Sequence, residues 1–210
     1  MIDTMQLMSA FKTTVEECSG VPLSQKECKK CLAMTLDKLI PLLKYKKKEL
    51  CLCANGISDF SEKLQYLEHD KFESLIDLTV YENDKDPFVC VLSAESEAFP
   101  SHDIEKDSTS DNSDYLWDFF KLLHVPSPFR IFLARTTMYR EHEKLDRVKT
   151  LQDRLQSFTE MYNQTCLSDG DKIFTIVLPT AKKHYSHVEC RGYQRINGIL
   201  GDVLNPGGRP

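Results

Sequence analysis

The second half of the chain alternates apolar segments with amphipathic ones, and this order restricts the fold more than any other feature of the sequence. Apolar segments at 87–97, 129–135 and 171–179 are separated by segments with helical spacing of apolar residues at 113–125 and 143–163. Strands that alternate with helices in this way usually pair in parallel through right-handed crossovers. We therefore expect parallel neighbouring strands in this half of the chain.

One further strand-like segment, 74–82, comes before these elements. Its apolar and polar side chains alternate, and the short polar stretch 83–87 connects it to the apolar segment 87–97 as a hairpin loop would. The predicted fold class is therefore α/β. It is a mixed sheet with a β-hairpin followed by β-α-β-α-β order, preceded by an N-terminal helical region.

The N-terminal region has helical periodicity. A first helix is expected near 3–18, and a second begins after Ser24, which has Glu27 three residues later as in a capping box. This second helix should end near Leu39, because Pro41 cannot continue it. The helical region is expected to extend to about residue 54.

The chain divides into three predicted parts. Residues 1–54 form a Cys-rich helical region, 55–198 form the α/β core, and 199–210, rich in Gly and Pro, form a flexible tail. Within the core, 58–69 is expected to be a short amphipathic helix and 100–114 a polar surface loop.

Composition and charge restrict the environment and the partners. Hydrophobic residues make up 41% and charged residues 28% of the chain, as in a soluble globular protein, and no apolar run approaches the ~20 residues that span a membrane. The N-terminus lacks the features of a secretory signal, so we expect a cytoplasmic location and no membrane contact. With a net charge of −5, nucleic acid would have to bind at local basic clusters, which can equally be solvated helix ends: Lys44, Lys46, Lys47, Lys48, Lys182, Lys183, Arg191 and Arg195.

Five of the eight cysteines lie in the N-terminal region, at Cys18, Cys28, Cys31, Cys51 and Cys53. Cys28 with Cys31 and Cys51 with Cys53 have spacings that let each pair hold one side of a Zn²⁺ ion. The alternative is that they are small buried hydrophobic residues, since Cys28 and Cys31 share one helix face with apolar residues. Disulfides are the third interpretation, and a reducing compartment disfavours them.

Three acidic residues stand on the predicted hairpin. Side chains alternate along a strand, so Glu95 and Glu97 share a face, and pairing Asp77 with Ser93 would put Asp77 diagonally beside Glu95. Carboxylates that crowd together repel unless a cation neutralises them, and Mg²⁺ or Mn²⁺ would do so. The alternative is that the glutamates mark where the strand reaches solvent and that Asp77 pairs with a lysine.

At these residues the sequence resembles the PD-(D/E)XK nuclease superfamily, which includes restriction and repair endonucleases. The family has an acid on one strand and (D/E)-x-K at the end of the next, and here Asp77 is followed after 17 residues by Glu95-x-Glu97. The resemblance covers about residues 58 to 178 by element order: helix, hairpin, helix, strand, helix, strand. Two positions differ, since Ile76 replaces the motif proline and Glu97 replaces the motif lysine.

The resemblance implies a role for each matching residue. Asp77 and Glu95 would bind Mg²⁺ or Mn²⁺, and Glu97 would be a further ligand or the base for the attacking water. Lys121 would supply the displaced cation, although a surface lysine is the alternative. The helix acid of the family would map to Glu62, where an exposed helical glutamate is the alternative.

Two functions follow from these residues. One is a Mg²⁺-dependent phosphodiester hydrolase that acts on nucleic acid, and the other is a catalytically silent α/β protein-interaction module whose partner docks on the Cys-rich helices or on segment 182–195. A polar and aromatic cluster, expected to be a solvated edge strand, lies in that segment: His184, Tyr185, His187, Glu189 and Cys190. The motifs of dinucleotide, nucleotide-triphosphate, zinc-protease and serine-hydrolase sites do not occur.

Overall fold

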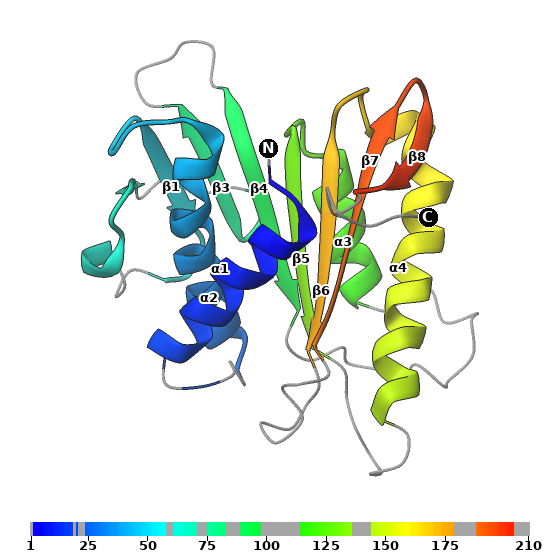
Figure 1. Ribbon diagram of the computed structural model, residues 1–210, viewed down its shortest axis with the longest axis horizontal. Coiled ribbons are helices and arrows are strands. Elements are labelled where there is room, and N and C mark those ends of the chain that lie inside the picture. The colour runs from blue at the N-terminus through cyan, green and yellow to red at the C-terminus, as the bar shows by residue number, and fades with distance from the viewer. Residues whose placement is uncertain are drawn as a thin grey trace.

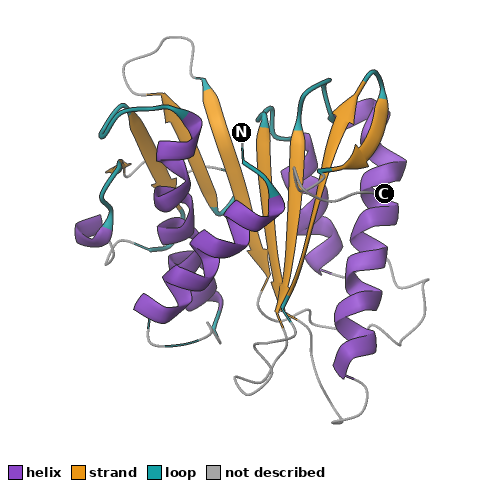
Figure 2. Cartoon of the chain, viewed as in Figure 1, coloured by secondary structure: helices purple, strands orange, loops and turns teal. Residues whose placement is uncertain are grey.

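The computed structural model shows one mixed sheet of eight strands with helices on both of its faces (Figure 1). The strand order is β2-β1-β3-β4-β5-β6-β7-β8. The structure describes residues 2–18, 20, 24–57, 61–70, 75–82, 89–97, 114–135, 144–178 and 188–203, and Figure 2 draws the remainder in grey.

The elements follow the chain in this order. The helices are α1 (Thr4–Glu17), α2 (Gln25–Leu39), α3 (Asp114–His124) and α4 (Lys144–Cys166), with short 3₁₀ helices η1 (Ile40–Leu43) and η2 (Ser61–Lys63). The strands are β1 (Leu50–Ala54), β2 (Leu67–Asp70), β3 (Leu78–Glu82), β4 (Cys90–Glu97), β5 (Phe129–Arg135), β6 (Lys172–Leu178), β7 (Glu189–Ile196) and β8 (Ile199–Asp202).

The predicted fold class is confirmed. β3 and β4 form the antiparallel hairpin, and β4, β5 and β6 pair in parallel with α3 and α4 as their crossovers. The apolar pattern predicted the bounds of β5 correctly. Every residue of β5 after the first is buried, because helices cover both faces of the sheet at this strand.

Each face of the sheet has its own hydrophobic core. α1 and α2 cover one face, where residues such as Phe11 and Leu36 meet Leu92 and Leu133 of the central strands. α3 and α4 cover the other face around Phe119, Leu155 and the opposite sides of β5 and β6. The sheet is therefore the middle layer of three.

The N-terminal helices start where the capping signals predict. Asp3 caps α1 and Ser24 caps α2. In both helices the side chain of the third residue accepts a hydrogen bond from the backbone N–H of the cap residue, as Glu27 does in α2. These helices lie on the sheet and share its core. The buried Lys172 of β6 fixes the start of the chain, since its Nζ donates to the Ile2 carbonyl at 2.9 Å. The N-terminal region is therefore part of the sheet-based unit.

Two segments predicted to be helical contain strands. Residues Leu50–Ala54 form β1, all five of whose residues are buried, and the predicted helix 58–69 is replaced over its described part by η2 and β2. The cause is a distant contact. The buried Asp37 carboxylate accepts hydrogen bonds from three successive backbone N–H groups, Gln65, Tyr66 and Leu67, at 2.8–2.9 Å and fixes the bend that leads into β2.

The predicted flexible tail begins with a strand. Asn197 and Gly198 have positive φ angles of 51° and 80° and connect β7 to β8 in a tight hairpin. An Asn-Gly pair between strands is a strong hairpin signal, so residues 199–202 belong to the sheet. Residues 204–210 of the predicted tail, and His184, Tyr185 and His187, lie outside the described residues.

Candidate functional site

Asp77 and Glu95 come together at the start of β3. Asp77 directly precedes β3 and is 8% exposed, and Glu95 in β4 is 3% exposed. The predicted pairing of Asp77 with Ser93 is wrong, because Thr79 pairs with Ser93 and Leu78 with Ala94. This difference of two residues brings Asp77 opposite Glu95, but Asp77 lies just outside β3, and its carboxylate contacts Lys29 of α2 whereas that of Glu95 contacts Lys121 of α3 on the other side of the sheet.

Each of the two acids accepts hydrogen bonds from the other's strand. The backbone N–H of Asp77 donates to Glu95 Oε2 at 2.6 Å. In return, Asp77 Oδ2 accepts from the backbone N–H of Ser96 at 3.1 Å and from its hydroxyl at 2.9 Å. These reciprocal bonds fix both carboxylates at the strand end.

A lysine from each helical layer pairs with one of the acids. Lys29 of α2 places its Nζ 2.6 Å from Asp77 Oδ1, and Lys121 of α3 places its Nζ 3.2 Å from Glu95 Oε1. Lys121 also binds Asp118 at 2.6 Å. We refer to Asp77, Glu95, Lys29 and Lys121 as the acid–lysine cluster.

The amide of Gln25, in the first turn of α2, completes the surroundings of Asp77. Its Nε2 donates to the Ser96 carbonyl and lies 3.5 Å from Asp77 Oδ2. One donor therefore reaches a carboxylate oxygen and a backbone carbonyl at once. The first turns of α2 thus approach the strand end on the side where Asp77 lies.

The electrostatics of the cluster favour an uncharged Glu95 below neutral pH. Burial, followed by repulsion from Asp77, raises the pKa of Glu95 to about 7. The pKa of its partner Lys121 is also raised, although burial opposes this, because Asp118 and Glu95 both bind its ammonium group. Asp118 keeps Lys121 charged whether or not Glu95 carries a proton, so the two shifts are compatible.

The carboxylate pair fits a Mg²⁺ or Mn²⁺ ion that takes most of its ligands from water and substrate. Mg²⁺ in proteins commonly binds one or two carboxylates and keeps several waters. Asp77 and Glu95 supply two carboxylates, and burial, followed by repulsion from Asp77, makes the charged form of Glu95 less favourable. The described residues contain no group of three or more His, Cys, Asp or Glu arranged to hold a metal.

The four thiols considered for zinc are divided by the sheet. Cys28 and Cys31 of α2 lie in the core under α1 and α2, whereas Cys51 and Cys53 of β1 form a small cluster with Tyr81. Because Leu50, Leu52 and Ala54 of β1 face the α2 side, the two β1 thiols face the other way. All four thiols are buried, and burial raises the pKa of Cys28 to about 12. Their placement matches the core-thiol interpretation.

The other predicted residues lie away from the acid pair or have different partners. Glu62 is exposed in η2 and does not stand on the predicted helix. Arg191 pairs with Asp153 and Glu189 at 2.7 Å, and Arg195 with Asp169 at 3.3 Å. The lysines from 44 to 48 are exposed, and Lys182 and Lys183 lie outside the described residues.

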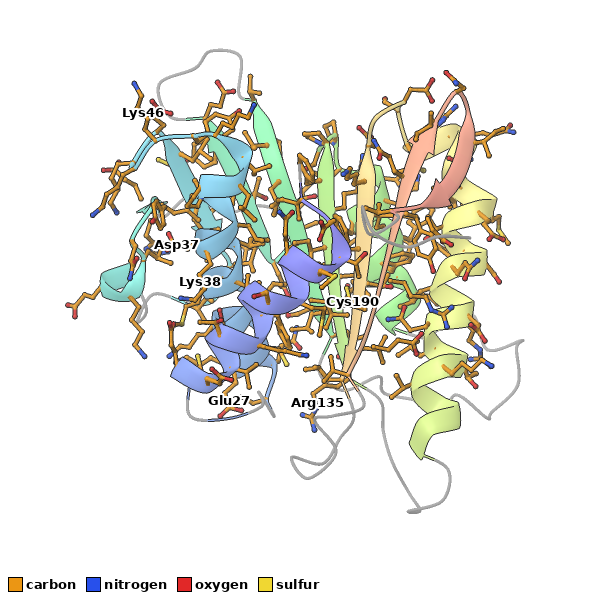
Figure 3. The ribbon with its side chains drawn as sticks, in the orientation of Figure 1. Glu27, Asp37, Lys38, Lys46, Arg135 and Cys190 are labelled. Carbon is orange, nitrogen blue, oxygen red and sulfur yellow. The ribbon has the colours of Figure 1, made fainter. Side chains whose placement is uncertain are left out.

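Sequence reasoning missed the groups that α2 and β5 bring to the site. Gln25 and Lys29 are four residues apart, which indicates a common helix face, but nothing local places that face over Asp77. Arg135 ends β5, is 3% exposed, and lies at the same end of the sheet as Glu27 of α2 (Figure 3). Burial lowers the pKa of Arg135, and the Cys28 and Glu27 side chains oppose this shift.

Comparison with known proteins adds no assignment. No protein-family model, no curated protein and no solved structure matches the chain. Among the described residues, no helix combines the length and apolar character needed to cross a bilayer.

Proposed function

We propose that the chain is a divalent-metal-dependent phosphodiester hydrolase that acts on nucleic acid at the acid–lysine cluster. The observation that carries the proposal is that two buried carboxylates, Asp77 and Glu95, are fixed at one strand end by hydrogen bonds between their segments, and that burial and then Asp77 raise the pKa of Glu95. Folded proteins rarely bury two adjacent acids without a functional reason, because each loses hydration and repels the other.

The order of elements supports the same assignment. The resemblance to PD-(D/E)XK nucleases implies helix, hairpin, helix, strand, helix and strand over residues 58–178, and the chain has the β3–β4 hairpin, α3, β5, α4 and β6 in this order. The first helix of that order is absent from the described part of 58–69, which contains η2 and β2. The helix α2, which contacts Asp77 through Lys29, lies before β1 and β2 in the chain.

Each residue of the cluster has a role in the proposed chemistry. Asp77 and Glu95 would hold Mg²⁺ or Mn²⁺, which when bound offsets the negative charge that develops on a phosphodiester under attack by water. Lys121, fixed between Glu95 and Asp118, supplies the cation that the motif carries at the position of Glu97. Glu97 is half-buried at the end of β4 and would accept the proton of the attacking water.

One observation favours the alternative of a catalytically silent interaction module. All four oxygens of the carboxylate pair already have a partner: Oδ1 and Oδ2 of Asp77 bind Lys29 and Ser96, and Oε1 and Oε2 of Glu95 bind Lys121 and the Asp77 N–H. A metal ion would have to share these oxygens with the two ammonium groups, whose positive charge repels it. If Lys29 and Lys121 bind the carboxylates more strongly than a metal ion does, the cluster is only an ion-pair network.

Metal-dependent stability separates the two functions. Thermal unfolding is measured at pH 8 with Mg²⁺, Mn²⁺ or chelator, for the wild type and for Asp77→Asn and Glu95→Gln. A bound ion at 100 times its dissociation constant adds about 2.7 kcal/mol to the free energy of unfolding. We expect this gain in the wild type and its loss in both variants.

The matched control is Glu82→Gln, an acid at the other end of β3 that accepts a bond from the Tyr45 hydroxyl. This variant should keep the full metal response. Cleavage of single- and double-stranded DNA and RNA with Mn²⁺ is then assayed with the same proteins. Metal-independent stability together with absent cleavage would assign the chain to the interaction module.

A further inference from the structure

A cysteine and a histidine meet at the far ends of α3 and α4. Cys166, the last residue of α4, places its Sγ 3.2 Å from Nε2 of His124, the last residue of α3. Each helix ends shortly before the strand that follows it, so this pair lies at the amino ends of β5 and β6. Asp77 and Glu95 instead contact Ser96 near the carboxyl end of β4. The Cys166–His124 pair is thus separate from the acid–lysine cluster.

The second ring nitrogen of His124 determines which atom of the Cys166–His124 pair donates the hydrogen bond. His124 Nδ1 lies 2.8 Å from the Phe120 carbonyl oxygen. A carbonyl only accepts, so Nδ1 carries the proton and the neutral ring presents its Nε2 lone pair to the thiol. The S–H of Cys166 therefore donates to Nε2, and His124 can take the proton from sulfur.

Aromatic neighbours hold the imidazole in this orientation. The His124 ring packs against Phe120 with 4.0 Å between ring centroids and against Tyr162 with 6.1 Å. The Thr165 hydroxyl donates to the Tyr162 carbonyl at 3.2 Å and lies 3.4 Å from Cys166 Sγ, so it would have to turn from that carbonyl to donate to a thiolate. A nucleophile, a base within hydrogen-bond reach and a third group that orients the base form the arrangement of an activated thiol.

The thiol can also be reached by a reagent. His124 is exposed and Cys166 is half-buried, whereas Cys28, Cys31, Cys51 and Cys53 are buried. Those four are shielded from small oxidants in the folded state. Cys166 therefore combines access with an adjacent base.

We propose that Cys166 is a thiol–disulfide exchange site for small disulfides. As His124 Nε2 takes the proton, Cys166 Sγ attacks one sulfur of the disulfide R–S–S–R, a Cys166–S–S–R bond forms, and the S–S bond of the reagent breaks. The leaving thiolate then takes the proton from His124 and departs as R–SH. The disulfide supplies the oxidation, so the step needs no further oxidant.

Cys18 provides an internal comparison in the same molecule. Cys18 is an exposed thiol at the end of α1, and its Sγ contacts the Met34 sulfur at 3.6 Å instead of an imidazole. Burial is the main cause that raises the pKa of Cys18. A difference in exchange rate between Cys166 and Cys18 therefore measures the effect of the neighbouring base.

The test uses the full chain with oxidised glutathione at pH 7. Samples are quenched in acid at timed intervals, digested, and analysed by mass spectrometry for glutathione at each cysteine. We expect Cys166 to exchange about tenfold faster than Cys18, and His124→Gln to slow Cys166 by about tenfold without changing Cys18. Thr165→Val should cause a smaller decrease at Cys166.

The wild-type comparison does not depend on the folding of any variant. Equal rates at Cys166 and Cys18 would overturn the proposal. An unchanged Cys166 rate in His124→Gln would overturn it as well, because the imidazole would then have no part in the exchange. The unchanged Cys18 rate in that variant verifies that the fold is retained.

Discussion

The raised pKa of Glu95 makes the stability of the protein depend on pH in a direction opposite to that of most acids. In the folded state this pKa is about 7, against an ordinary value of 4.5, because the carboxyl group is buried beside Asp77. Between these two values the folded state binds more protons at Glu95 than the unfolded state does. The contribution of Glu95 to the free energy of unfolding is therefore fully present below about pH 4.5 and is lost as pH rises to about 7.

The size of the effect follows from the shift. Each pKa unit corresponds to about 1.4 kcal/mol, so a rise from 4.5 to about 7 costs roughly 3 kcal/mol of unfolding free energy above pH 7. Glu95→Gln removes the titration. The difference in unfolding free energy between the wild type and this variant should thus move by about 3 kcal/mol in favour of the variant between pH 4.5 and pH 8.

Urea unfolding with chelator present measures this difference at several pH values. Subtracting the variant from the wild type cancels the titration of groups that do not interact with Glu95, and Glu82→Gln, treated in the same way, should give a curve that does not fall over this range. A difference between the wild type and Glu95→Gln that is flat, or that rises with pH, would refute the reasoning, since Glu95 would then be an ordinary or a stabilised carboxylate.

Two further substitutions test the surroundings of the site and of the sheet. Lys29→Met removes the cation from Asp77, whose side chain is 10% exposed, and should cost about 2 kcal/mol in urea unfolding at pH 7; no loss would mean that the ion pair is not formed in solution. Gly192→Ala would place a Cβ 2.7 Å from the Phe174 ring and should cost about 1–3 kcal/mol, while Gly201→Ala, with open space around it, should change stability by less than about 0.5 kcal/mol. Equal effects of the two alanines would contradict the close approach of β7 to Phe174.

The parts of the fold that the sequence predicts are those in which local pattern and burial agree. β5 and β6 are apolar on both faces because helices cover both, and α2 shows its capping box in Ser24 and Glu27. β2 could not be predicted in this way, because the acceptor that holds it is Asp37, about 30 residues earlier. The hydrogen bonds to the distant Asp37 carboxylate thus outweigh the helical spacing of apolar residues in 58–69.

The candidate site shows the same division. Alternation along two strands is local information, and it predicted that Asp77 and Glu95 are neighbours, but it did not predict that Asp77 turns toward α2 while Glu95 contacts Lys121 of α3. The exact register depends on an irregularity between Val80 and Tyr81, where the pairing with β4 shifts, and the sequence carries no clear sign of it. Lys29 comes from a helix 48 residues before Asp77, and only the packing of α2 on the sheet brings it there.

The charges of the cluster connect its protonation to its proposed metal. Asp77, Glu95 and Asp118 carry three negative charges when ionised, while Lys29 and Lys121 carry two positive ones, so these five side chains together have an excess of one negative charge. Below about pH 7 a proton on Glu95 removes this excess. A divalent cation would remove it above that pH, and the proton and the cation would compete for the same carboxylate.

This competition sets an expected pH dependence for metal binding. Because a coordinating carboxylate must be ionised, the affinity for Mg²⁺ or Mn²⁺ should rise about tenfold per pH unit from pH 5 to pH 7 and level off above it. The dissociation constant is measured by titration calorimetry at each pH, with Glu95→Gln as the control that lacks the titrating group. Binding that does not vary with pH would place the ion away from Glu95, and the lysines would then be the only cations that this carboxylate pair requires.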